Sequence, residues 1–423
     1  MTYRNVLVLA YYFPPMGLSG VQRITKFVKY LPEFGWKPHV VTTGPVAYYA
    51  HDESLLEDIE GRDVAVYRTA GKDPNSLLAR KGTIRMPREI IRKTLSRISN
   101  TLFIPDNKKG WAKQAMTIAR EIIARENIDV IFVSGPPFSA MIAGAQLAEE
   151  FGIPLVVDYR DLWYGNQFTF YPTPWHAHQN KEKEFDVLKH ASRVTVTNRR
   201  MKEVMITNYP HLAFDDVIIV PHGYDSDDFS ASSRSSESFT LTYTGTFYDF
   251  VTPRFFFRAV AKFMKEHPTA PLELHFAGIL RDEYVKIARR LGIADRIVHH
   301  GYLPHRESTS LLQSSTALWM MVGNVRNADT VSSGKLYEYF GSRKPLLVSV
   351  GEGALRKDAE RYGASWITQP DDVDAIAQSI AEIYAHWRKG TLPTPNEDVV
   401  QGFHRRTITD SLARVLAMAT RVS

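Results

Sequence analysis

The sequence predicts an α/β protein built from two doubly wound domains, and three observations support this fold class. Short apolar strands alternate with helical patterns along nearly the whole chain, which is typical of parallel sheets covered by helices on both faces. A serine-rich break over residues 230–238 has six serines in nine residues and predicts a linker. The chain has 423 residues, which is long for one domain and comfortable for two.

The first half supplies the first domain. Short apolar runs predict its strands, and apolar residues at helical spacing between those runs predict its helices. We expect strands at residues 6–10, 38–42, 130–134, 155–158, 193–197 and 217–220, and helices at 21–31, 112–125 and 140–151.

The second half repeats the pattern after the serine-rich break. We expect strands at 240–244, 272–277, 297–300, 316–322, 346–350 and 365–368, and helices at 254–265, 282–291, 371–388 and 405–419. The predicted domains are 1–229 and 239–390, joined by the linker 230–238, and a closing segment, 391–423, is expected to pack back on the first domain. Because ligands of open parallel sheets bind outside the carboxyl ends of the strands, two such sheets facing a central cleft would hold a ligand between them.

The composition excludes several kinds of site. The absence of cysteine excludes disulfides and thiolate metal sites and favours a reducing, cytoplasmic setting. No apolar run approaches the roughly 18 to 20 residues that a membrane span needs. Fourteen histidines show no metal-ligand spacing, and Asp225-Ser226-Asp227 lies beside the linker instead of a sheet's active edge. We therefore expect no bound metal and no cofactor.

A basic segment at residues 80–104 concentrates the charge of the chain. Between Arg80 and Arg97, seven basic residues stand against one acid, which equals the whole net charge of +6. Apolar residues are interleaved with these charges at near-helical spacing, as in helices that bind anionic lipid head groups. A packed helix with a solvated basic face is the alternative. Nucleic acid is a less favoured partner, because no second basic cluster or recognition motif accompanies the segment.

Residues 332–340 carry the strongest chemical signal, and they predict a loop followed by a short helix. Ser333 and Gly334 precede the first turn, whose unpaired N–H groups attract anions, and Lys335 adds a full positive charge there. Glu338 lies three residues beyond Lys335, so both are expected on roughly one face of the helix. A cation beside a carboxylate suits a diphosphate joined to a ribose, which predicts a nucleotide-sugar pocket; a solvated surface pair is the alternative.

Two loops of the first domain also carry candidate residues. Gly17 and Gly20 follow the first strand and would let the backbone approach an anion or a sugar, although a plain turn is the alternative. Asp158, Arg160 and Asp161 follow the strand at 155–158. Asp161 could position or deprotonate an acceptor hydroxyl, with Arg160 on a phosphate. A structural ion pair is the competing interpretation.

The second domain opens with a strand that ends in a glycine turn. Gly245 and Thr246 follow that strand, and Arg254 offers a fork suited to phosphate oxygens. Tyr302 marks the end of a further strand of the same sheet.

Taken in order, these motifs make the chain resemble the GT-B fold glycosyltransferases similar to family 4, of the bacterial cell-surface polysaccharide type. The resemblance covers nearly the whole length. The motifs that carry it are Tyr12-Phe13-Pro14-Pro15 with Gly17 and Gly20, Asp158-Tyr159-Arg160-Asp161-Leu162-Trp163, Pro221-His222-Gly223-Tyr224-Asp225, Tyr243-Thr244-Gly245, Gly301-Tyr302-Leu303-Pro304-His305 and Gly334-Lys335-Leu336-Tyr337-Glu338-Tyr339.

The resemblance implies a retaining, metal-independent transfer of a sugar from a nucleotide diphosphate donor to a hydroxyl of a glycan or lipid-linked acceptor. It implies acceptor binding by the first domain, including Asp158 and Phe138, and donor binding by the second. Glu338 matches the family glutamate that takes the ribose hydroxyls. Thr330 stands where the family has another glutamate, and the loop of Phe138 lacks the family's histidine. Arg254 and Lys335 would supply the charge that stabilises the leaving diphosphate.

Two other functions compete with the transferase. A sugar-nucleotide epimerase uses the same fold and needs no acceptor. A non-catalytic nucleotide-sugar-binding or scaffold protein of a polysaccharide assembly complex would fit the missing glutamate and histidine. For a transferase, a cytoplasmic location at the inner face of the plasma membrane is expected from the basic segment.

Overall fold

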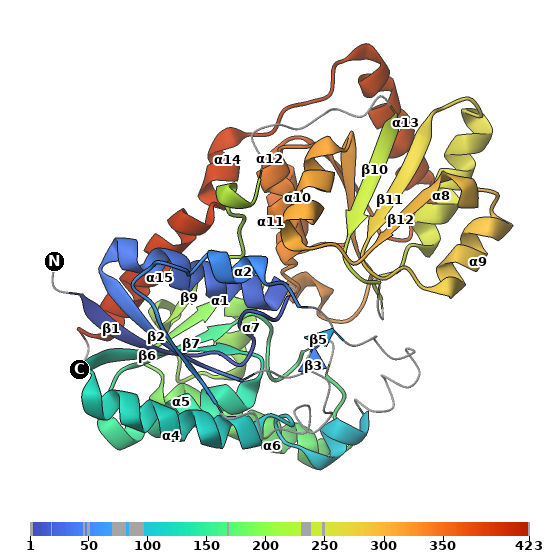
Figure 1. Cartoon of the computed structure of the whole chain (residues 1–423). Helices are drawn as coiled ribbons and strands as arrows, with labels where there is room; N and C mark the ends of the chain where they lie inside the picture. Colours follow the sequence, from blue (N-terminus) through green and yellow to red (C-terminus); the bar gives the residue numbers. More distant parts are fainter. Residues whose placement is uncertain are drawn as a thin grey trace. The chain divides into compact units, whose positions relative to one another are not determined.

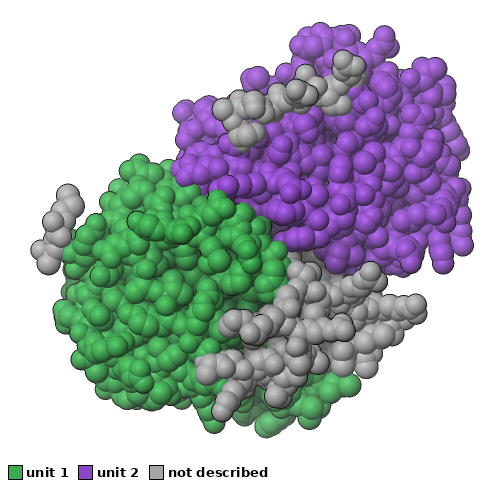
Figure 2. All heavy atoms as spheres, viewed as in Figure 1, with its two compact units in different colours: residues 1–222, 405–423 green, residues 223–404 purple. Residues whose placement is uncertain are grey.

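A computed structural model of the chain describes residues 3–17, 19–44, 47–48, 51–69, 82–83, 97–166, 169–229, 238–247 and 250–421. These residues form two compact units, the first of residues 1–222 with 405–423 and the second of residues 223–404 (Figure 2). The expected linker lies outside the described residues except for Ser238, and so does most of the expected basic segment.

Unit 1 is built on a parallel sheet of seven strands in the order β4-β2-β1-β6-β7-β8-β9 (Figure 1). The strands are β1 (Arg4–Leu9), β2 (Trp36–Thr42), β4 (Ala65–Arg68), β6 (Ile128–Gly135), β7 (Leu155–Tyr159), β8 (Arg193–Val196) and β9 (Val217–Ile219). Strand order turns back between β1 and β6, so the loops after these two strands border the switch point where ligands of such sheets bind.

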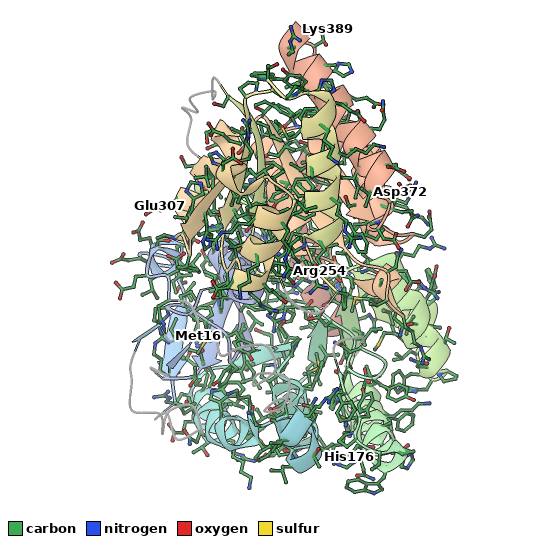
Figure 3. The ribbon with its side chains drawn as sticks, turned by 90° about the vertical axis from the view of Figure 1, so that its right-hand side faces the viewer. Met16, His176, Arg254, Glu307, Asp372 and Lys389 are labelled. Atoms are coloured by element: carbon green, nitrogen blue, oxygen red, sulfur yellow. The ribbon has the colours of Figure 1, made fainter. Side chains whose placement is uncertain are left out.

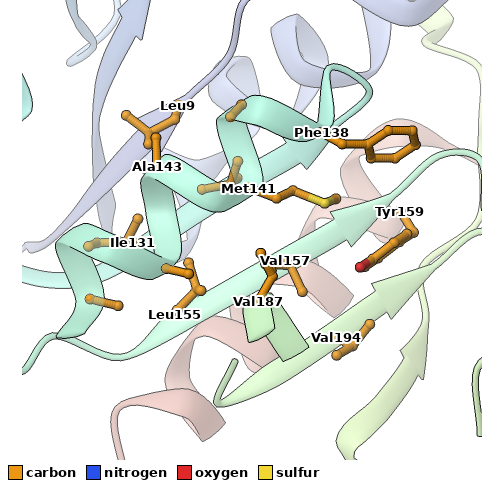
Figure 4. Packing of buried hydrophobic residues seen from close by; sticks show 14 of the residues in the cluster. Leu9, Ile131, Phe138, Met141, Ala143, Leu155, Val157, Tyr159, Val187 and Val194 are labelled. Atoms are coloured by element: carbon orange, nitrogen blue, oxygen red, sulfur yellow. The ribbon is translucent and has the colours of Figure 1, made fainter. Parts of the chain in front are cut away.

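Helices cover both faces of this sheet because successive residues of its central strands, which point to opposite faces, are apolar. Val6 and Val8 pack with α1 (Ser19–Tyr30) and α15 (Arg405–Ala419). Leu7 and Leu9 belong to the opposite cluster, with α4 (Lys109–Arg125), α5 (Phe138–Phe151) and α6 (Pro174–His190) (Figure 4). Unit 1 also contains the helices α2 (Ser54–Glu57) and α7 (Arg199–Asn208).

Unit 2 contains a parallel sheet of six strands in the order β12-β11-β10-β13-β14-β15. The strands are β10 (Phe239–Thr244), β11 (Leu272–Ala277), β12 (Ile297–Gly301), β13 (Ala317–Val322), β14 (Leu346–Val350) and β15 (Ser365–Thr368). One face packs against α8 (Arg254–Glu266), α9 (Asp282–Arg290) and α13 (Val373–Lys389). The other packs against α10 (His305–Ser314), α11 (Gly334–Ser342), α12 (Ala354–Tyr362) and α14 (Glu397–Gly402).

The predicted strands and helices of both halves are confirmed within two residues at nearly every boundary. Strand β4 and the helices α2, α6, α7, α10, α12 and α14 were not predicted from the sequence. The reason is plainest in α6, where two of the four buried side chains, Asn180 and Glu184, are polar, so the apolar period is weak. In the part of the chain that the structure describes, no helix combines the length and apolar character of a membrane span.

Candidate active site

Lys335 of α11 lies at the carboxyl end of β10. Its Nζ atom donates a hydrogen bond of 3.0 Å to the hydroxyl of Tyr243 and sits 4.9 Å from the centre of that ring. Gly245 directly follows β10 with φ +124°, and a Cβ atom at this position would collide with the end of the Lys335 side chain. The backbone conformation of Gly245 therefore favours glycine, and a larger residue would also have to displace the end of the Lys335 side chain.

Tyr339, one turn after Lys335, fixes α11 against the same strand. Its hydroxyl accepts a hydrogen bond of 2.9 Å from the backbone N–H of Thr244. Burial raises the pKa of Tyr339 to about 12, so the hydroxyl stays protonated. Ser333 caps the helix without using its side chain, which leaves the first backbone N–H groups of α11 for an anion. The arrangement combines a helix N-terminus with a fixed ammonium group.

Glu338 points to a different neighbour, α10. Its Oε1 atom lies 3.0 Å from Nε2 of His305, whose Nδ1 is 3.7 Å from a carboxylate oxygen of Asp228. Lys335 and Glu338 thus contact different neighbours, although residues three apart diverge by only about 60° around a helix and lie on roughly one face. Their binding of one ligand stays a prediction. Tyr302, which precedes α10, is 43% exposed.

Loops that follow β13 and β14 line an open pocket at the same sheet edge. The pocket has a volume of about 490 Å³ and is lined by residues 324–329 with Gly351 and Glu352. Thr330 is buried and its hydroxyl donates to the carbonyl of Asn327 at 2.7 Å, so it faces inward. Asp329 supplies the nearest carboxylate of this loop to the pocket. Its backbone packs so closely on Gly353 that a Cβ atom there would lie 2.8 Å away.

Arg254, labelled in Figure 3, starts α8 after the same strand as Gly245 and Thr246, but its guanidinium pairs with Glu283 of α9. It lies 3.5 Å from Glu283 in an ion pair whose two side chains are about half exposed. The structure places Arg254 at the expected sheet edge without bringing it into contact with Lys335.

In unit 1, Asp158 is a structural carboxylate. It is fully buried and accepts hydrogen bonds from Ser134 at 2.8 Å and Thr195 at 2.7 Å, while Arg23 bonds both of its oxygens. Burial alone would raise the pKa of Asp158. The charge and hydrogen bonds of Arg23, together with the hydrogen bonds from the Thr195 and Ser134 hydroxyls, outweigh this effect and lower the pKa. The expected contact of Asp158 with an acceptor is therefore corrected: every oxygen is used within the fold.

Arg23 was not selected from the sequence, yet it organises the edge of the sheet. Besides Asp158 it donates to the carbonyls of Val220 at 2.8 Å and Pro221 at 2.7 Å. His222 follows; burial and the charges of Arg23, Arg405 and Arg160 lower its pKa well below the ordinary value. This imidazole is neutral at physiological pH. The burial of Arg23 could be recognised only from the fold, because the sequence pattern of α1 is also compatible with an arginine on the helix surface.

Arg160 joins three loops. Its side chain donates to the carbonyls of Gly20 at 2.7 Å and Gly135 at 3.3 Å, and also to that of Pro136. A Cβ atom at Gly20 would collide with this guanidinium. Arg160 is buried and holds the loops after β1 and β6 against β7. Gly17 lies in the loop after β1. These contacts explain the position of Arg160 without the phosphate partner that the sequence suggested.

Asp161 is the one carboxylate of this motif that stays available. It is partly exposed and makes no hydrogen bond through its carboxylate to the described residues. Burial raises its pKa against the opposing effect of Arg160. Phe138 begins the neighbouring helix α5 and stacks on Trp163 with ring centres 4.8 Å apart. Asp161 lies two residues before Trp163, one half of this buried aromatic wall, and its carboxylate has the properties of a hydrogen-bond acceptor for a sugar hydroxyl.

Known proteins resemble this chain in sequence family and in fold. Residues 20–228 match the family model described as Glycosyltransferase Family 4. None of the curated proteins matches the chain in sequence.

Solved structures share the fold over the entire chain. A glycosyltransferase from Rickettsia africae aligns with a TM-score of 0.66 and 12% identity and covers 100% of both chains. HepE from Anabaena, in complex with UDP and glucose, aligns with a TM-score of 0.66 and 14% identity over 98% of this chain and 100% of its own. The lipopolysaccharide outer core galactosyltransferase WaaB aligns with a TM-score of 0.60 and 10% identity over 98% and 99%. These likenesses confirm the predicted fold class, with two doubly wound domains on parallel sheets.

Proposed function

We propose that this chain is a glycosyltransferase resembling family 4, and that it transfers a sugar from a nucleoside diphosphate sugar to a hydroxyl of a glycan or lipid-linked acceptor. The observation that carries the donor part is the placement of Lys335 with the N-terminus of α11 at the end of β10. A fixed ammonium group and free backbone N–H groups favour a diphosphate. HepE, whose structure holds UDP and glucose, supports a donor of this chemical class.

The other donor contacts follow from the same sheet edge. Glu338 takes the ribose hydroxyls, displacing or sharing His305, which now lies 3.0 Å away. Thr246, Tyr302 and Ser333 border the nucleotide. The donor sugar enters the pocket of residues 324–329, where Asp329 replaces the acidic group that Thr330 does not provide. Arg254 contributes to the phosphates only after leaving Glu283.

The transfer proceeds on one face of the sugar, with retention and without a metal ion. The acceptor oxygen forms the new bond to the anomeric carbon while the bond to the diphosphate oxygen breaks. The acceptor proton moves to the departing diphosphate, whose charge Lys335 and the α11 N-terminus stabilise. Asp161 holds the acceptor hydroxyl in place.

An acceptor in cell-surface polysaccharide synthesis, presented at the inner face of the plasma membrane, fits two observations. WaaB, which shares the fold, is a lipopolysaccharide outer core galactosyltransferase. In unit 1, five exposed apolar side chains gather where the helical residues 97–102 meet the start of α6. They are Ile98, Leu102, Phe103, Phe170 and Trp175, each at least 39% exposed. We call them the apolar patch.

Local contacts hold the two segments of the apolar patch together. The guanidinium of Arg97 lies 5.2 Å from the Phe170 ring, and His176 lies 3.2 Å from the carbonyl of Thr101. Arg97 ends the basic run that begins at Arg80. Aromatic and apolar side chains beside basic residues suit an anionic lipid surface.

A screen of nucleotide sugars tests the proposed function. UDP, GDP, ADP and TDP sugars are added singly, and the midpoint of thermal unfolding is measured, because a bound donor stabilises the fold by mass action. We expect one base to raise the midpoint, and Lys335→Ala to abolish that shift. Transfer or hydrolysis of the selected donor is then followed with and without EDTA, and equal rates are expected.

Three outcomes would contradict the proposal. No shift with any sugar nucleotide would remove the donor site. Donor binding without hydrolysis or transfer would favour the scaffold function, and conversion of the donor to its epimer, followed by NMR, would favour the epimerase.

A further inference from the structure

Two polar residues of α6, Asn180 and Glu184, are buried one helical turn apart. Asn180 is 7% exposed and Glu184 is 1% exposed. Burying a carboxylate and an amide costs free energy unless each is hydrogen-bonded, so their partners indicate their purpose.

Glu184 holds the chain just after Asp161. Its Oε2 atom accepts a hydrogen bond of 2.8 Å from the backbone N–H of Tyr164 and one of 2.7 Å from the hydroxyl of Tyr209. Its Oε1 atom and the hydroxyl of Tyr159 are both buried, and within the described residues neither has a well-formed hydrogen bond. Tyr159 ends β7 and faces the packed interior (Figure 4).

Asn180 holds the preceding residue, Trp163. Its Oδ1 atom accepts a hydrogen bond of 2.9 Å from the indole N–H of Trp163, and its own amide donates to the carbonyl of His176 at 2.8 Å. The hydroxyl of Tyr171 donates to the carbonyl of Trp163 at 3.0 Å. The side chain of Trp163 and the backbone of Tyr164 are thus both hydrogen-bonded to α6.

We propose that Asn180 and Glu184 are a positioning pair that holds segment 161–164 against α6, and so sets the place of Asp161 and of the Phe138–Trp163 wall. The inference rests on the proposed function in one respect: the positioning matters for transfer because Asp161 meets the acceptor. The pair itself contacts no substrate. The pair acts on Asp161 indirectly, by holding the backbone of segment 161–164 in place.

The charge of Glu184 makes the positioning dependent on pH. Burial raises the pKa of Glu184 to about 7, against the opposing hydrogen bonds from the Tyr209 hydroxyl and the Tyr164 N–H and the charge of Lys181. The groups that face it are Tyr159 from β7, Tyr164 and Tyr171 from the following loop, Tyr209 after α7 and Lys181 from α6; burial raises the pKa of Tyr159, Tyr171 and Tyr209. These tyrosines stay neutral across the range in which Glu184 titrates.

The direction of the pH effect follows from comparing two states of segment 161–164. In the closed state the segment is held against α6, and in the open state it is released from α6. In the open segment Glu184 is hydrated and its pKa is near the ordinary 4.5; in the closed segment it is about 7. The closed state therefore holds a proton that the open state loses, and opening becomes more favourable as pH rises from 4.5 to 7. A full separation of those values corresponds to at most about a 300-fold change in the opening equilibrium.

Hydrogen–deuterium exchange of the full-length protein tests the proposal without any sugar. The probe is the peptide that contains the Tyr164 amide, compared at pH 5 and pH 8 after correction for intrinsic exchange rates. In the wild type we expect protection of this amide to be at least about tenfold lower at pH 8 than at pH 5. Glu184→Gln, which keeps the acceptor oxygen and removes the charge, should be protected equally at both pH values.

Two further variants complete the test. Glu184→Ala should lose protection at both pH values, whereas Glu182→Ala, at a side chain 56% exposed on the same helix, should behave as the wild type. Should Glu184→Ala fail to fold, the comparison of wild type with Glu184→Gln still decides. A pH-independent wild type, or a Gln variant that keeps the pH dependence, would overturn the positioning pair.

These readouts separate the positioning pair from the transferase. Exchange at Tyr164 requires neither donor nor acceptor, so its failure leaves the proposed function intact. Conversely, Asp161→Asn tested for transfer of the donor selected by the thermal screen examines the acceptor contact alone.

Discussion

The ammonium group of Lys335 lies 3.0 Å from the hydroxyl of Tyr243, in space that exists only because residue 245 is glycine. Lys335 extends from the first turn of α11, while Tyr243 is a buried residue of β10 that also stacks on Phe247. The lysine is thus held by the strand before any donor arrives. A cation fixed in this way loses little freedom when a diphosphate binds, which favours stabilisation of developing negative charge.

Replacing Lys335 by alanine is expected to lower turnover of the donor by about a hundredfold or more, because one charge-stabilising contact is lost. Tyr243→Phe keeps the ammonium group and removes only its hydrogen bond, so it should cost about tenfold or less. Initial rates of donor hydrolysis or transfer, with donor saturation in each variant, measure the difference. Equal rates in wild type and Lys335→Ala would contradict the assigned role.

Gly245→Ala offers a second test of the same contact. The new Cβ atom collides with the Lys335 side chain, and φ +124° is unfavourable for alanine, so we expect a loss of about 1–3 kcal/mol in stability. In the Lys335→Ala background the collision is absent, and the loss should shrink to the backbone part. Urea unfolding of the four proteins in this double-mutant cycle measures the coupling. Gly292→Ala is the control, since its φ is +71° and no atom lies within 4 Å of the added Cβ.

The sequence predicted most of the strands well because they depend on local patterns. Short, largely apolar runs such as residues 346–350 favour a buried strand, and a lysine after a glycine at a helix start is visible without a structure. The partners were not visible. Tyr243 is 92 positions from Lys335, and Arg23 is 135 positions from Asp158. Such pairs arise from the order of strands in the sheet.

The same limit explains the corrected assignment of Asp158. From the sequence, two carboxylates and an arginine at a strand end predict a binding site, and Asp158 and Asp161 look alike. Only the fold distinguishes them: Asp158 points between β6 and β8, where Ser134 and Thr195 reach it, while Asp161 lies beyond the strand. Asp225 shows the same effect, since its carboxylate caps a short helix by accepting from the N–H of Asp227 at 3.1 Å.

The buried pair of Arg23 and Asp158 predicts a defined response of unit 1 to mutation and to acid. Asp158→Asn should destabilise the unit by about 3–5 kcal/mol, because the Arg23 charge stays buried without its partner. The pKa of Asp158 is lowered in the fold, so its contribution to stability is complete above the ordinary value of 3.8 and is lost as the pH falls below it. Denaturant unfolding from pH 8 to pH 3 should show no loss from this group above about pH 5. Thr195→Val, which removes one donor to the same carboxylate, is the milder control at about 1 kcal/mol; a larger loss for Thr195→Val than for Asp158→Asn would contradict the assignment.

The apolar patch predicts binding to anionic vesicles. Trp175 is 59% exposed and Leu102 is 69% exposed, and Arg97 lies beside them. We expect the protein to sediment with phosphatidylcholine vesicles that contain phosphatidylglycerol at low ionic strength, and to be released at about 0.5 M salt, where charges are screened within a few ångströms. Trp175→Ser should weaken this binding by about tenfold or more, since a large aromatic surface leaves the interface. Phe214→Ser is the matched control, because this side chain is 62% exposed in the same unit but stacks with Lys202 away from the patch. If vesicle binding survives in a variant that combines Trp175→Ser and Arg97→Glu, the lipid contact lies on other residues. If Phe214→Ser weakens vesicle binding as much as Trp175→Ser does, exposed aromatic side chains in general make the contact.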